Sequence, residues 1–305
     1  MTSRSQPPIL TSYILEVYET YNKNTVWLKE RMEVARKEYE NVWCSSTHPN
    51  HRKVYEDLSR YYDVNVLNDL AECESGWDMT TRFEGKCLSF IPIDLNCLLH
   101  KYELDFARYY QIIGDEDKAD IWQSKAAYRQ ANINKILWNE TDGFYFDYNY
   151  AEGYPSQVYS LAAYYAMSCQ VATHAQAQKL IDKLDKFNFA GGLATTSSPV
   201  NNDPRTFNKQ WTYPNGWSPL HWRVVDGLKK YGYHEQAEII ARKWLKTNLD
   251  YFLENGFFKE CYNVVSPNEK ANKGIYPHQV GFGWTNGVFL DLAYEYLTPE
   301  ELLKV

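Results

Sequence analysis

Apolar residues recur at helical spacing along much of the chain. Between residues 93 and 113 they fall three and four positions apart, which is the period of an amphipathic α-helix. The same spacing returns between residues 119 and 137, after Gly114 and Asp115. A glycine favours the end of a helix and an aspartate the start of the next. Because two helices joined by so short a turn lie antiparallel, the pattern predicts a helical hairpin over residues 93–137.

The rest of the chain shows the same alternation of helical segments and connections. Further helices are predicted over residues 8–22, 25–43, 51–60, 155–169, 173–187, 217–231, 234–254 and 284–297, and strands over 144–148 and 257–258. No Pro/Gly/Ser-rich linker separates them. The simplest interpretation is a single all-α catalytic domain over residues 1–305, built as a toroid of helical hairpins with a central pocket.

Composition adds an aromatic signal to this picture. Aromatic residues make up 16% of the 305-residue chain, with 26 Tyr and 10 Trp. Most are expected to pack in helical cores. Four tryptophans lie instead beside Gly, Pro or Asn in the longer connections: Trp77, Trp211, Trp217 and Trp284. Connections run over the surface, so an indole there is a candidate to stack on a ligand, with core packing as the alternative.

Charge and cysteine content exclude several classes of partner. The net charge is −7 and no basic run stands out, so neither nucleic acid nor an anionic membrane is an expected partner. No apolar stretch approaches the length of a membrane span, and the N-terminus lacks the apolar segment of a signal peptide. Six cysteines without a CxxC pattern favour a reducing, cytoplasmic location.

Two carboxylates lie in aromatic, glycine-rich surroundings far apart in the sequence. Asp78 ends Glu74-Ser75-Gly76-Trp77-Asp78, and Glu260 follows Gly256-Phe257-Phe258-Lys259. One acid and one base are the minimum set for glycoside hydrolysis. Asp78 is the candidate acid, with a helix cap as the alternative. Glu260 is the candidate base, which Lys259 or an arginine across the pocket would keep ionised, with a solvated loop carboxylate as the alternative.

Polar side chains in the same connections are candidates to bind hydroxyl groups. Each has a structural alternative: an ion pair for the arginines, a turn or a helix cap for the others. The candidate substrate-binding residues are Arg4, Arg82, Asp94, Asn96, Gln210, Trp211, Asn215, Trp217 and Trp284. The histidines show no zinc spacing, and no phosphate-binding or dinucleotide motif is present, so no metal and no cofactor are predicted.

Taken together, these motifs resemble the trehalases, inverting glycoside hydrolases with an (α/α)6 barrel. Segments that occur in the family's order are Arg4-Ser5-Gln6-Pro7-Pro8, Glu74–Asp78, Gly191-Gly192-Leu193, Gln210-Trp211-Thr212-Tyr213-Pro214-Asn215-Gly216-Trp217, the segment from Glu260, and Gly281-Phe282-Gly283-Trp284-Thr285-Asn286-Gly287. The resemblance implies that Asp78 is the general acid and Glu260 the general base. It also implies an (α/α)6-barrel-type toroid that is incomplete at the N-terminus, because this sequence lacks the family's Pro-Gly-Gly-Arg-Phe signature and the barrel's N-terminal part.

The sequence departs from the family pattern at four positions. Thr212 stands where trehalases usually have Asp, Cys261 and Asn263 replace Lys and Asp, and Ile275 replaces a Glu. The resemblance predicts hydrolysis of an α-glucoside, most of all α,α-trehalose. The departures keep two alternatives open: an inverting glycosidase for another small α-glucoside, and a diverged or truncated sugar-binding protein without turnover. Self-association, or a partner chain that completes the barrel, is the expected interaction besides the sugar.

Overall fold

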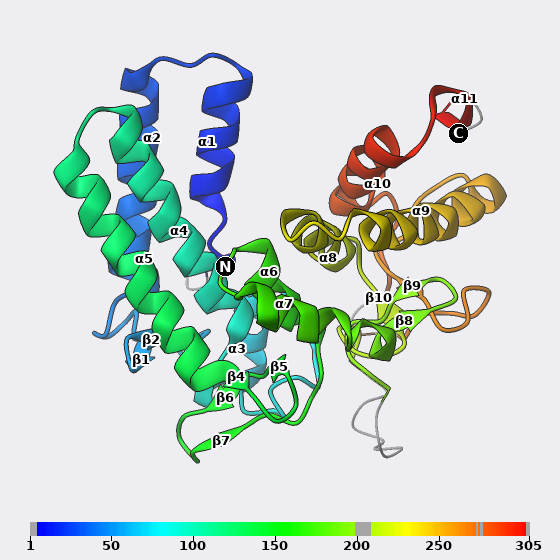
Figure 1. Ribbon diagram of the computed structural model, residues 1–305. Helices are drawn as coiled ribbons and strands as arrows, with labels where there is room; N and C mark the ends of the chain where they lie inside the picture. Colours follow the sequence, from blue (N-terminus) through cyan, green and yellow to red (C-terminus); the bar gives the residue numbers. More distant parts are fainter. Residues whose placement is uncertain (1–4, 199–208, 273, 275–276, 303–305) are drawn as a thin grey trace. The chain divides into compact units, whose positions relative to one another are not determined.

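The computed structural model describes residues 5–198, 209–272, 274 and 277–302. Helices dominate the described chain, and its strands are two or three residues long (Figure 1). The chain divides into two compact units. Unit 1 comprises Met1–Gly76, Phe83–Glu140 and Tyr145–Ser156, and unit 2 comprises Trp77–Arg82, Thr141–Phe144 and Gln157–Val305. The predicted all-α class is confirmed, whereas a single catalytic domain over residues 1–305 stays a prediction.

Unit 1 consists of long helices and short antiparallel strands. Its helical segments are α1 (Leu10–Thr20), α2 (Thr25–Glu38), the π-helical turn η1 (Tyr39–Trp43), α3 (Asn68–Ser75), the 3-10 turn η2 (Cys87–Ser89), α4 (Ile93–Ile112) and α5 (Glu116–Leu137). Its strands are β1 (Lys53–Tyr55) and β2 (Leu58–Ser59), which pair, the three-stranded sheet of β3 (Phe90–Ile91), β6 (Tyr148–Asn149) and β7 (Tyr154–Pro155), and β4 (Trp138–Asn139). β5 (Phe144–Tyr145) lies where the chain passes between the units.

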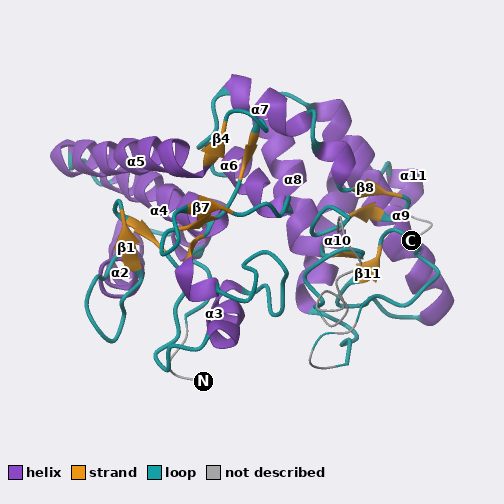
Figure 2. Ribbon diagram, turned by 90° about the horizontal axis from the view of Figure 1, so that it is seen from below, coloured by secondary structure: helices purple, strands orange, loops and turns teal. Residues whose placement is uncertain are grey.

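The predicted hairpin is the longest element of unit 1. Helices α4 and α5 lie side by side in both views (Figures 1 and 2). Gly114, at the turn, has a φ of 77°, which a glycine adopts without strain. Asp115 then caps α5, because its carboxylate accepts a hydrogen bond of 3.2 Å from the backbone N–H of Lys118. The turn chemistry read from the sequence is therefore the chemistry that joins the two helices.

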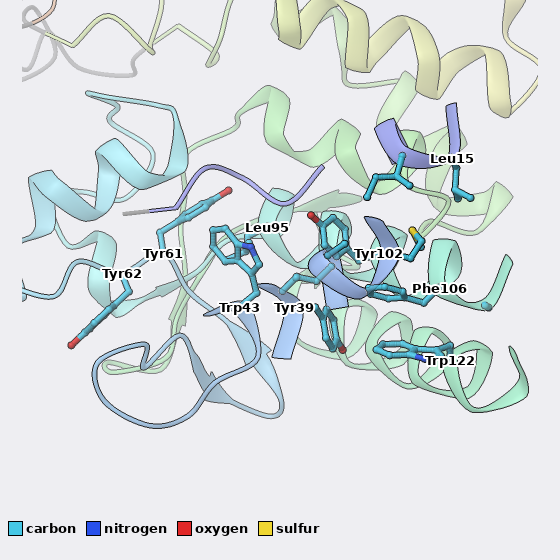
Figure 3. Packing of buried hydrophobic residues seen from close by; sticks show 14 of the residues in the cluster. Leu15, Tyr39, Trp43, Tyr61, Tyr62, Leu95, Tyr102, Phe106 and Trp122 are labelled. Carbon is cyan, nitrogen blue, oxygen red and sulfur yellow. The ribbon is translucent and has the colours of Figure 1, made fainter. Parts of the chain in front are cut away.

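Aromatic side chains from three helical segments form the core of unit 1. Tyr39 of η1, Phe106 of α4 and Trp122 of α5 lie next to one another (Figure 3). The ring centroids of Tyr39 and Trp122 are 5.2 Å apart at 72°, and those of Phe106 and Trp122 are 4.5 Å apart. Edge-to-face and tilted pairs of this kind add to the stabilisation from buried area. Many of the aromatic residues counted in the sequence thus serve the core, as expected.

Unit 2 has the same character, with helices joined by short paired strands. Its helical segments are η3 (Leu161–Tyr164), α6 (Tyr165–Ser168), α7 (His174–Ile181), η4 (Leu184–Lys186), α8 (Ser218–Lys230), α9 (His234–Asn255), α10 (Gly283–Tyr296) and α11 (Pro299–Leu302). Strand β8 (Asn188–Phe189) pairs with β9 (Gly192–Leu193), and β10 (Asn215–Gly216) pairs with β11 (Tyr262–Asn263). Helices α7 to α10 fall close to the ranges predicted from periodicity, although α7 is shorter than predicted.

The pairing of β10 with β11 joins two of the motifs singled out in the sequence. The strands are antiparallel, with Asn215 opposite Asn263 and Gly216 opposite Tyr262. A Cβ atom at Gly216 would lie 2.4 Å from a side-chain carbon of Val264, so only glycine permits this close approach. The segment that ends at Trp217 and the segment that follows Glu260 are therefore neighbours in space.

The helix predicted over residues 51–60 is wrong. This segment is the β1–β2 hairpin, whose turn residues Glu56 and Asp57 have φ angles of 48° and 58°. Two consecutive positive φ angles are typical of a tight hairpin turn, which the sequence usually announces with Asn-Gly. Because Glu-Asp carries no such signal, periodicity alone suggested a helix. Helix α3, in contrast, was not predicted, since its eight residues lie in a segment assigned to a connection.

Two further predictions are corrected. The helix expected over residues 155–169 is confined to the consecutive segments η3 and α6, because Pro155 pairs in strand β7 with Tyr148 instead. The strand expected over residues 257–258 lies one residue later, where Lys259 forms an isolated bridge with Val280. The strand expected over residues 144–148 is represented by β5 and the start of β6.

Candidate active site

The predicted acid lies in the short segment Trp77–Arg82, which belongs to unit 2. Helix α3 ends at Gly76, whose φ of 75° gives the left-handed conformation that commonly ends a helix. Trp77 is buried, and Asp78 is partly buried. After Asp78 the described chain makes bends and turns instead of starting a helix, so the helix-cap alternative for Asp78 does not hold.

Four consecutive residues, 209–212, hold this segment in place. Three bind its backbone carbonyl groups and the fourth pairs with a hydroxyl. Lys209 Nζ donates to the Thr80 carbonyl at 2.7 Å, Gln210 Nε2 to the Asp78 carbonyl at 2.8 Å and the Trp211 N–H to the Met79 carbonyl at 3.0 Å, while the Thr212 and Thr81 hydroxyls lie 2.9 Å apart. Residues far apart in the sequence thus fix the backbone on which the Asp78 carboxyl is mounted.

The environment of Asp78 favours the protonated form of its carboxyl. Burial is the main cause that raises the pKa of Asp78; a hydrogen bond from the residue's own backbone N–H opposes it, and the negative charge of Glu260 adds a smaller increase. Desolvation and a like charge both disfavour ionisation. A carboxyl with a raised pKa is suited to donate a proton to a leaving oxygen. The electrostatic interaction also means that the predicted acid and base lie near each other within unit 2.

Glu260 is held by a loop from further along the chain. Its side chain is 1% exposed, and its Oε2 accepts a hydrogen bond of 3.2 Å from the backbone N–H of Gln279. The backbone N–H of Glu260 in turn donates to the Gln279 carbonyl at 3.1 Å. The alternative of a solvated loop carboxylate does not fit a side chain this deeply buried.

Lys259 does not accompany Glu260 in the way the sequence suggested. Its ammonium lies 3.8 Å from the centre of the Tyr251 ring and 5.7 Å from that of Tyr262, so the cation is placed against aromatic faces. Burial lowers the pKa of Lys259. The expectation that Lys259 keeps Glu260 ionised through direct pairing is therefore corrected.

The tryptophans form one cluster with unequal exposure. The rings of Trp211 and Trp217 are stacked with centroids 3.8 Å apart at 7°, and Trp284 lies edge-on to both at 5.9 Å. Trp77 lies 5.6 Å from Trp211. Trp217 is 0% exposed and Trp211 3%, whereas Trp284 is 37% exposed. Trp217 therefore has no face to offer a ligand and supports the ring of Trp211.

Three polar candidates in unit 2 are fully buried. The guanidinium of Arg82 lies over the Trp77 ring, 4.7 Å from its centre, and Gln210 donates to the Asp78 carbonyl. Asn215 donates to the carbonyls of Gln210 and Asn272 and accepts from the Asn272 N–H, all within 3.0 Å. Asn215 thus joins two loops, which favours the structural alternative for this residue.

The remaining candidates lie outside unit 2. Asp94 and Asn96 belong to the first turn of α4 in unit 1. Asp94 accepts a hydrogen bond of 3.1 Å from the Tyr61 hydroxyl. Asn96 accepts from the Ser59 N–H and donates to the Ser59 and Pro92 carbonyls, so its amide is used within unit 1. Arg4 lies outside the described residues, as does Ile275.

The family departures near the two carboxylates have structural partners. The Thr212 hydroxyl lies 2.9 Å from that of Thr81 and 3.1 Å from that of Thr196, forming a short hydroxyl chain. Cys261 is buried beside Glu260, and its Sγ lies 3.4 Å from His278 Nδ1. Burial raises the pKa of the Cys261 thiol, so it stays protonated. Asn263 accepts from the backbone N–H groups of two later residues and so shapes a turn.

Sequence reasoning did not single out Lys209 or Gln279. Lys209 holds the segment after Asp78, and the backbone of Gln279 holds Glu260. Lys209 directly precedes the Gln210 motif, and that adjacency was the available signal. Gln279 acts through its backbone, which any residue but proline supplies, so its type carries no signal.

Two kinds of site, a metal centre and a membrane span, are not found in the part of the chain that the structure describes. Within that part, no group of three or more His, Cys, Asp or Glu side chains is arranged to hold a metal ion. None of the described helices combines the length and hydropathy that a membrane span requires.

Comparison with known proteins gives consistent matches. The family model described as Trehalase matches residues 1–72 and 66–296. The cytosolic neutral trehalase of Saccharomyces cerevisiae is 30% identical over 378 residues, covering 96% of this chain and 49% of that protein. The cytosolic neutral trehalase of Pyricularia oryzae is 30% identical, covering 94% of the chain and 50% of that protein. The chain thus spans about half the length of these curated relatives.

Solved structures extend the comparison to the fold. The neutral trehalase Nth1 from Saccharomyces cerevisiae matches with a TM-score of 0.86 at 28% identity, over 98% of this chain and 63% of that one. A GH63 mannosylglycerate hydrolase from Thermus thermophilus, solved with glucose, matches with a TM-score of 0.67 at 18% identity, over 96% of this chain and 75% of that one. At that identity the second match concerns the fold alone.

The alignments also locate a difference inside the matched span. The alignment with the yeast relative is longer than the 305-residue chain itself, so the relative carries internal segments that this chain lacks. The two family-model matches meet at residues 66–72. The structure has a tight turn just before this junction, where Val66 has a φ of 58° and is exposed.

Proposed function

Because the chain belongs to the trehalase family, we propose that it hydrolyses an α-glucosidic bond, with α,α-trehalose as the preferred substrate. The observation that carries the proposal is the presence in unit 2 of two carboxyl groups shielded from solvent, Asp78, whose pKa is raised mainly by burial, and Glu260. Curated relatives are named cytosolic, which supports the same location for this chain.

Asp78 is the proposed general acid. Its raised pKa keeps the carboxyl protonated at higher pH than an exposed aspartate, whose pKa is about 3.9. The proton passes to the glycosidic oxygen as the bond to the sugar breaks. The contacts of residues 209–212 with the Asp78 segment support this role, because an acid that must meet one oxygen gains from a fixed backbone.

Glu260 is the proposed general base. It removes a proton from a water that attacks the anomeric carbon from the opposite face, so the configuration inverts. A buried carboxylate held by the Gln279 N–H has a defined orientation for this step. Inversion requires the two carboxyls to stand far enough apart to admit the water, about 6.5–9.5 Å in such enzymes.

The exposed face of Trp284 is the proposed sugar platform. Trp211 and Trp217 support it from the buried side, and Arg82 and Gln210 contribute through the segment that carries Asp78. For Asp94 and Arg4, substrate binding stays a proposal from the sequence motifs. For Asn96 and Asn215 we propose the supporting role that their hydrogen bonds favour.

The test is the anomeric composition of fresh product. Proton NMR of trehalose hydrolysis, recorded before mutarotation, should show β-glucose from the attacked half and α-glucose from the leaving half in equal amounts. Product that is α-glucose from both halves would exclude inversion. The absence of any glucose, with a folded protein, would exclude the proposed activity.

A second candidate is favoured by the Thr212 hydroxyl chain and by the internal segments that this chain lacks. With a hydroxyl in place of the family's carboxylate, the site would suit another small α-glucoside, or would bind sugar without turnover. Calorimetry paired with a glucose assay separates these cases: binding of trehalose without glucose release over a day supports the non-catalytic alternative. Turnover of an aryl α-glucoside in preference to trehalose supports the other.

Self-association, or a partner chain that completes the helical ring, is part of the proposal. Helix α10 carries Leu290 and Tyr294 with 54% and 76% exposure, which supports an interface. Light scattering on the purified chain tests it: a monomer at all concentrations, with full activity, would remove this element of the proposal.

A further inference from the structure

Unit 1 contains a cavity that none of the predicted site residues lines. It has a volume of about 320 Å³ and is bounded by η1, the β1–β2 hairpin and the facing sides of α4 and α5. This volume is at the lower end of the range for small-molecule sites. Since Glu103 of α4 belongs to its lining and is 1% exposed, we name it the Glu103 pocket.

Glu103 has one carboxylate oxygen without a partner. Its Oε1 accepts a hydrogen bond of 2.5 Å from the Tyr39 hydroxyl and one of 2.8 Å from Arg129 Nε. Its Oε2 accepts none from any residue in the described part of the chain. Leaving a buried acceptor unmatched is destabilising. A ligand that brings a hydroxyl donor to Oε2 would remove this cost.

The guanidinium of Arg129 is also incompletely used. It binds Glu103 through Nε alone, whereas a fork-to-fork pair would use both carboxylate oxygens. The contacts of its two terminal nitrogens with oxygen atoms of Asp57, Asn96 and Tyr39 are long, at 3.4–3.5 Å, and the fourth contact is with the Cys44 sulfur at 3.5 Å. A ligand oxygen in the cavity would form shorter hydrogen bonds with this guanidinium than its present oxygen partners do.

The rim of the pocket adds a positively charged residue, Lys125, that forms no ion pair with a described carboxylate. Lys53 pairs with Asp57 at 3.0 Å, and Glu40 pairs with Arg36 at 2.5 Å. Lys125 of α5 is exposed and forms no ion pair with any described residue; its ammonium lies 4.1 Å from the centre of the Trp122 ring. Among the charged residues that line the pocket, Lys125 is thus the cation without a carboxylate partner. The buried acceptor Glu103 Oε2 and the donor Arg129 belong to the same lining.

We propose that the Glu103 pocket binds a small hydroxylated anion of the size of a monosaccharide phosphate. A hydroxyl of the ligand donates to Glu103 Oε2, another oxygen accepts from the terminal nitrogens of Arg129, and the anionic group lies at Lys125. The site is separate from the proposed chemistry of Asp78 and Glu260 and does not depend on it.

Isothermal titration calorimetry with glucose 6-phosphate tests the proposal. The wild-type chain should bind the probe, and Lys125→Gln should weaken binding about tenfold, the usual effect of losing one charged hydrogen bond. Lys118→Gln is the matched control, because Lys118 is an exposed lysine of the same helix that does not line the cavity. Its affinity should equal that of the wild type.

Two half-probes locate the binding. Glucose and inorganic phosphate should each bind more weakly than glucose 6-phosphate. Of these two half-probes, only phosphate should lose affinity in Lys125→Gln. Glu103→Gln, if circular dichroism shows it folded, should weaken both glucose and glucose 6-phosphate. No binding of glucose 6-phosphate by the wild type overturns the proposal. Equal affinities for Lys125→Gln and Lys118→Gln overturn it as well, because the probe then occupies another site.

Discussion

Glu74 and Asp78 lie in one short motif, but their carboxyls have opposite surroundings. Glu74 is 0% exposed and accepts hydrogen bonds from two nitrogens of Arg52 and from the backbone N–H groups of Ser5 and Tyr62. Asp78 is partly buried, and burial together with the charge of Glu260 raises its pKa. Hydrogen-bond donors surround the carboxylate of Glu74, whereas the surroundings of Asp78 disfavour the ionised form of its carboxyl.

The difference separates two uses of a buried acid. A carboxylate whose lone pairs are occupied by donors from several segments holds those segments together. Arg52 reinforces this role, since its guanidinium also lies over the rings of Trp43 and Tyr62. A carboxyl whose backbone is fixed while its pKa is raised is ready for proton transfer. Substitution of Asp78 should therefore lower turnover, whereas substitution of Glu74 should lower stability.

The largest effect is expected on turnover at Asp78 and Glu260. Asp78→Asn and Glu260→Gln should each lower kcat by roughly 10²–10⁴, the usual contribution of a positioned acid or base. Both substitutions keep the shape of the side chain, so both variants should stay folded. Asp69→Asn, an exposed aspartate of α3, is the control and should keep wild-type turnover. A loss below tenfold at either carboxylate would remove that residue from its role.

The complementary effect is expected on stability at Glu74. Glu74→Gln leaves the buried Arg52 without its charge partner, so the free energy of unfolding should fall by roughly 3–5 kcal/mol. Urea denaturation followed by circular dichroism measures it, with the exposed Glu84→Gln as control. The fraction that stays folded should retain turnover. If Glu74→Gln abolished turnover at full stability, Glu74 would belong with Asp78 and the comparison would collapse.

A smaller effect is expected on the titration of Asp78. The negative charge of Glu260 raises the pKa of Asp78, so Glu260→Gln should lower that pKa. NMR titration of the labelled aspartate carboxyls measures the shift. Burial alone should still keep the pKa above that of an exposed aspartate, about 3.9. An unchanged pKa in Glu260→Gln would mean that the two carboxyls do not interact.

The same shift has a consequence for stability. Because the folded-state pKa of Asp78 is raised, its proton-linked stability is fully present below the unfolded pKa and is lost as pH rises through the folded pKa. Asp78→Asn does not titrate. Its stability relative to the wild type should therefore rise with pH through this window, as measured by denaturation at a series of pH values. A difference that is constant with pH would contradict the raised pKa.

The smallest effect is expected from the exposed tryptophan. Trp284→Leu should raise KM about two- to tenfold, since a stacked ring contributes about 0.5–1.5 kcal/mol, and should leave the melting temperature close to wild type. Trp217→Leu removes a fully buried ring and should lower the melting temperature instead. The pair repeats the comparison of Glu74 with Asp78 for another residue type. Equal effects of the two substitutions on KM would contradict it.

Much of the fold was predictable because long amphipathic helices show a clear period of apolar residues in the sequence. The α4–α5 hairpin follows from period and turn residues, and α8, α9 and α10 follow from period alone. The β1–β2 hairpin escaped because its turn, Glu56-Asp57, uses residues that rarely take positive φ angles. Helix α3 escaped because eight residues are too few for a clear period.

The candidate site was less predictable, because sequence does not say what a polar side chain touches. Asp78 and Glu260 stood out through their motifs, but the raised pKa of Asp78 depends on an environment assembled by folding. Asn215 and Trp217 looked like sugar contacts, whereas the first joins two loops and the second is fully buried. Glu103 gave no signal, because an unmatched oxygen is visible only in three dimensions.

The contact between Gln210 and the Asp78 carbonyl spans 132 residues of sequence. During synthesis, the segment that bears the acid leaves the ribosome long before the residues that hold it, and Glu260 follows later still. Domains generally fold as units, and contacts this distant in sequence form slowly. A nascent chain therefore carries an acid with neither its support nor its base until residues 209–260 have been synthesised.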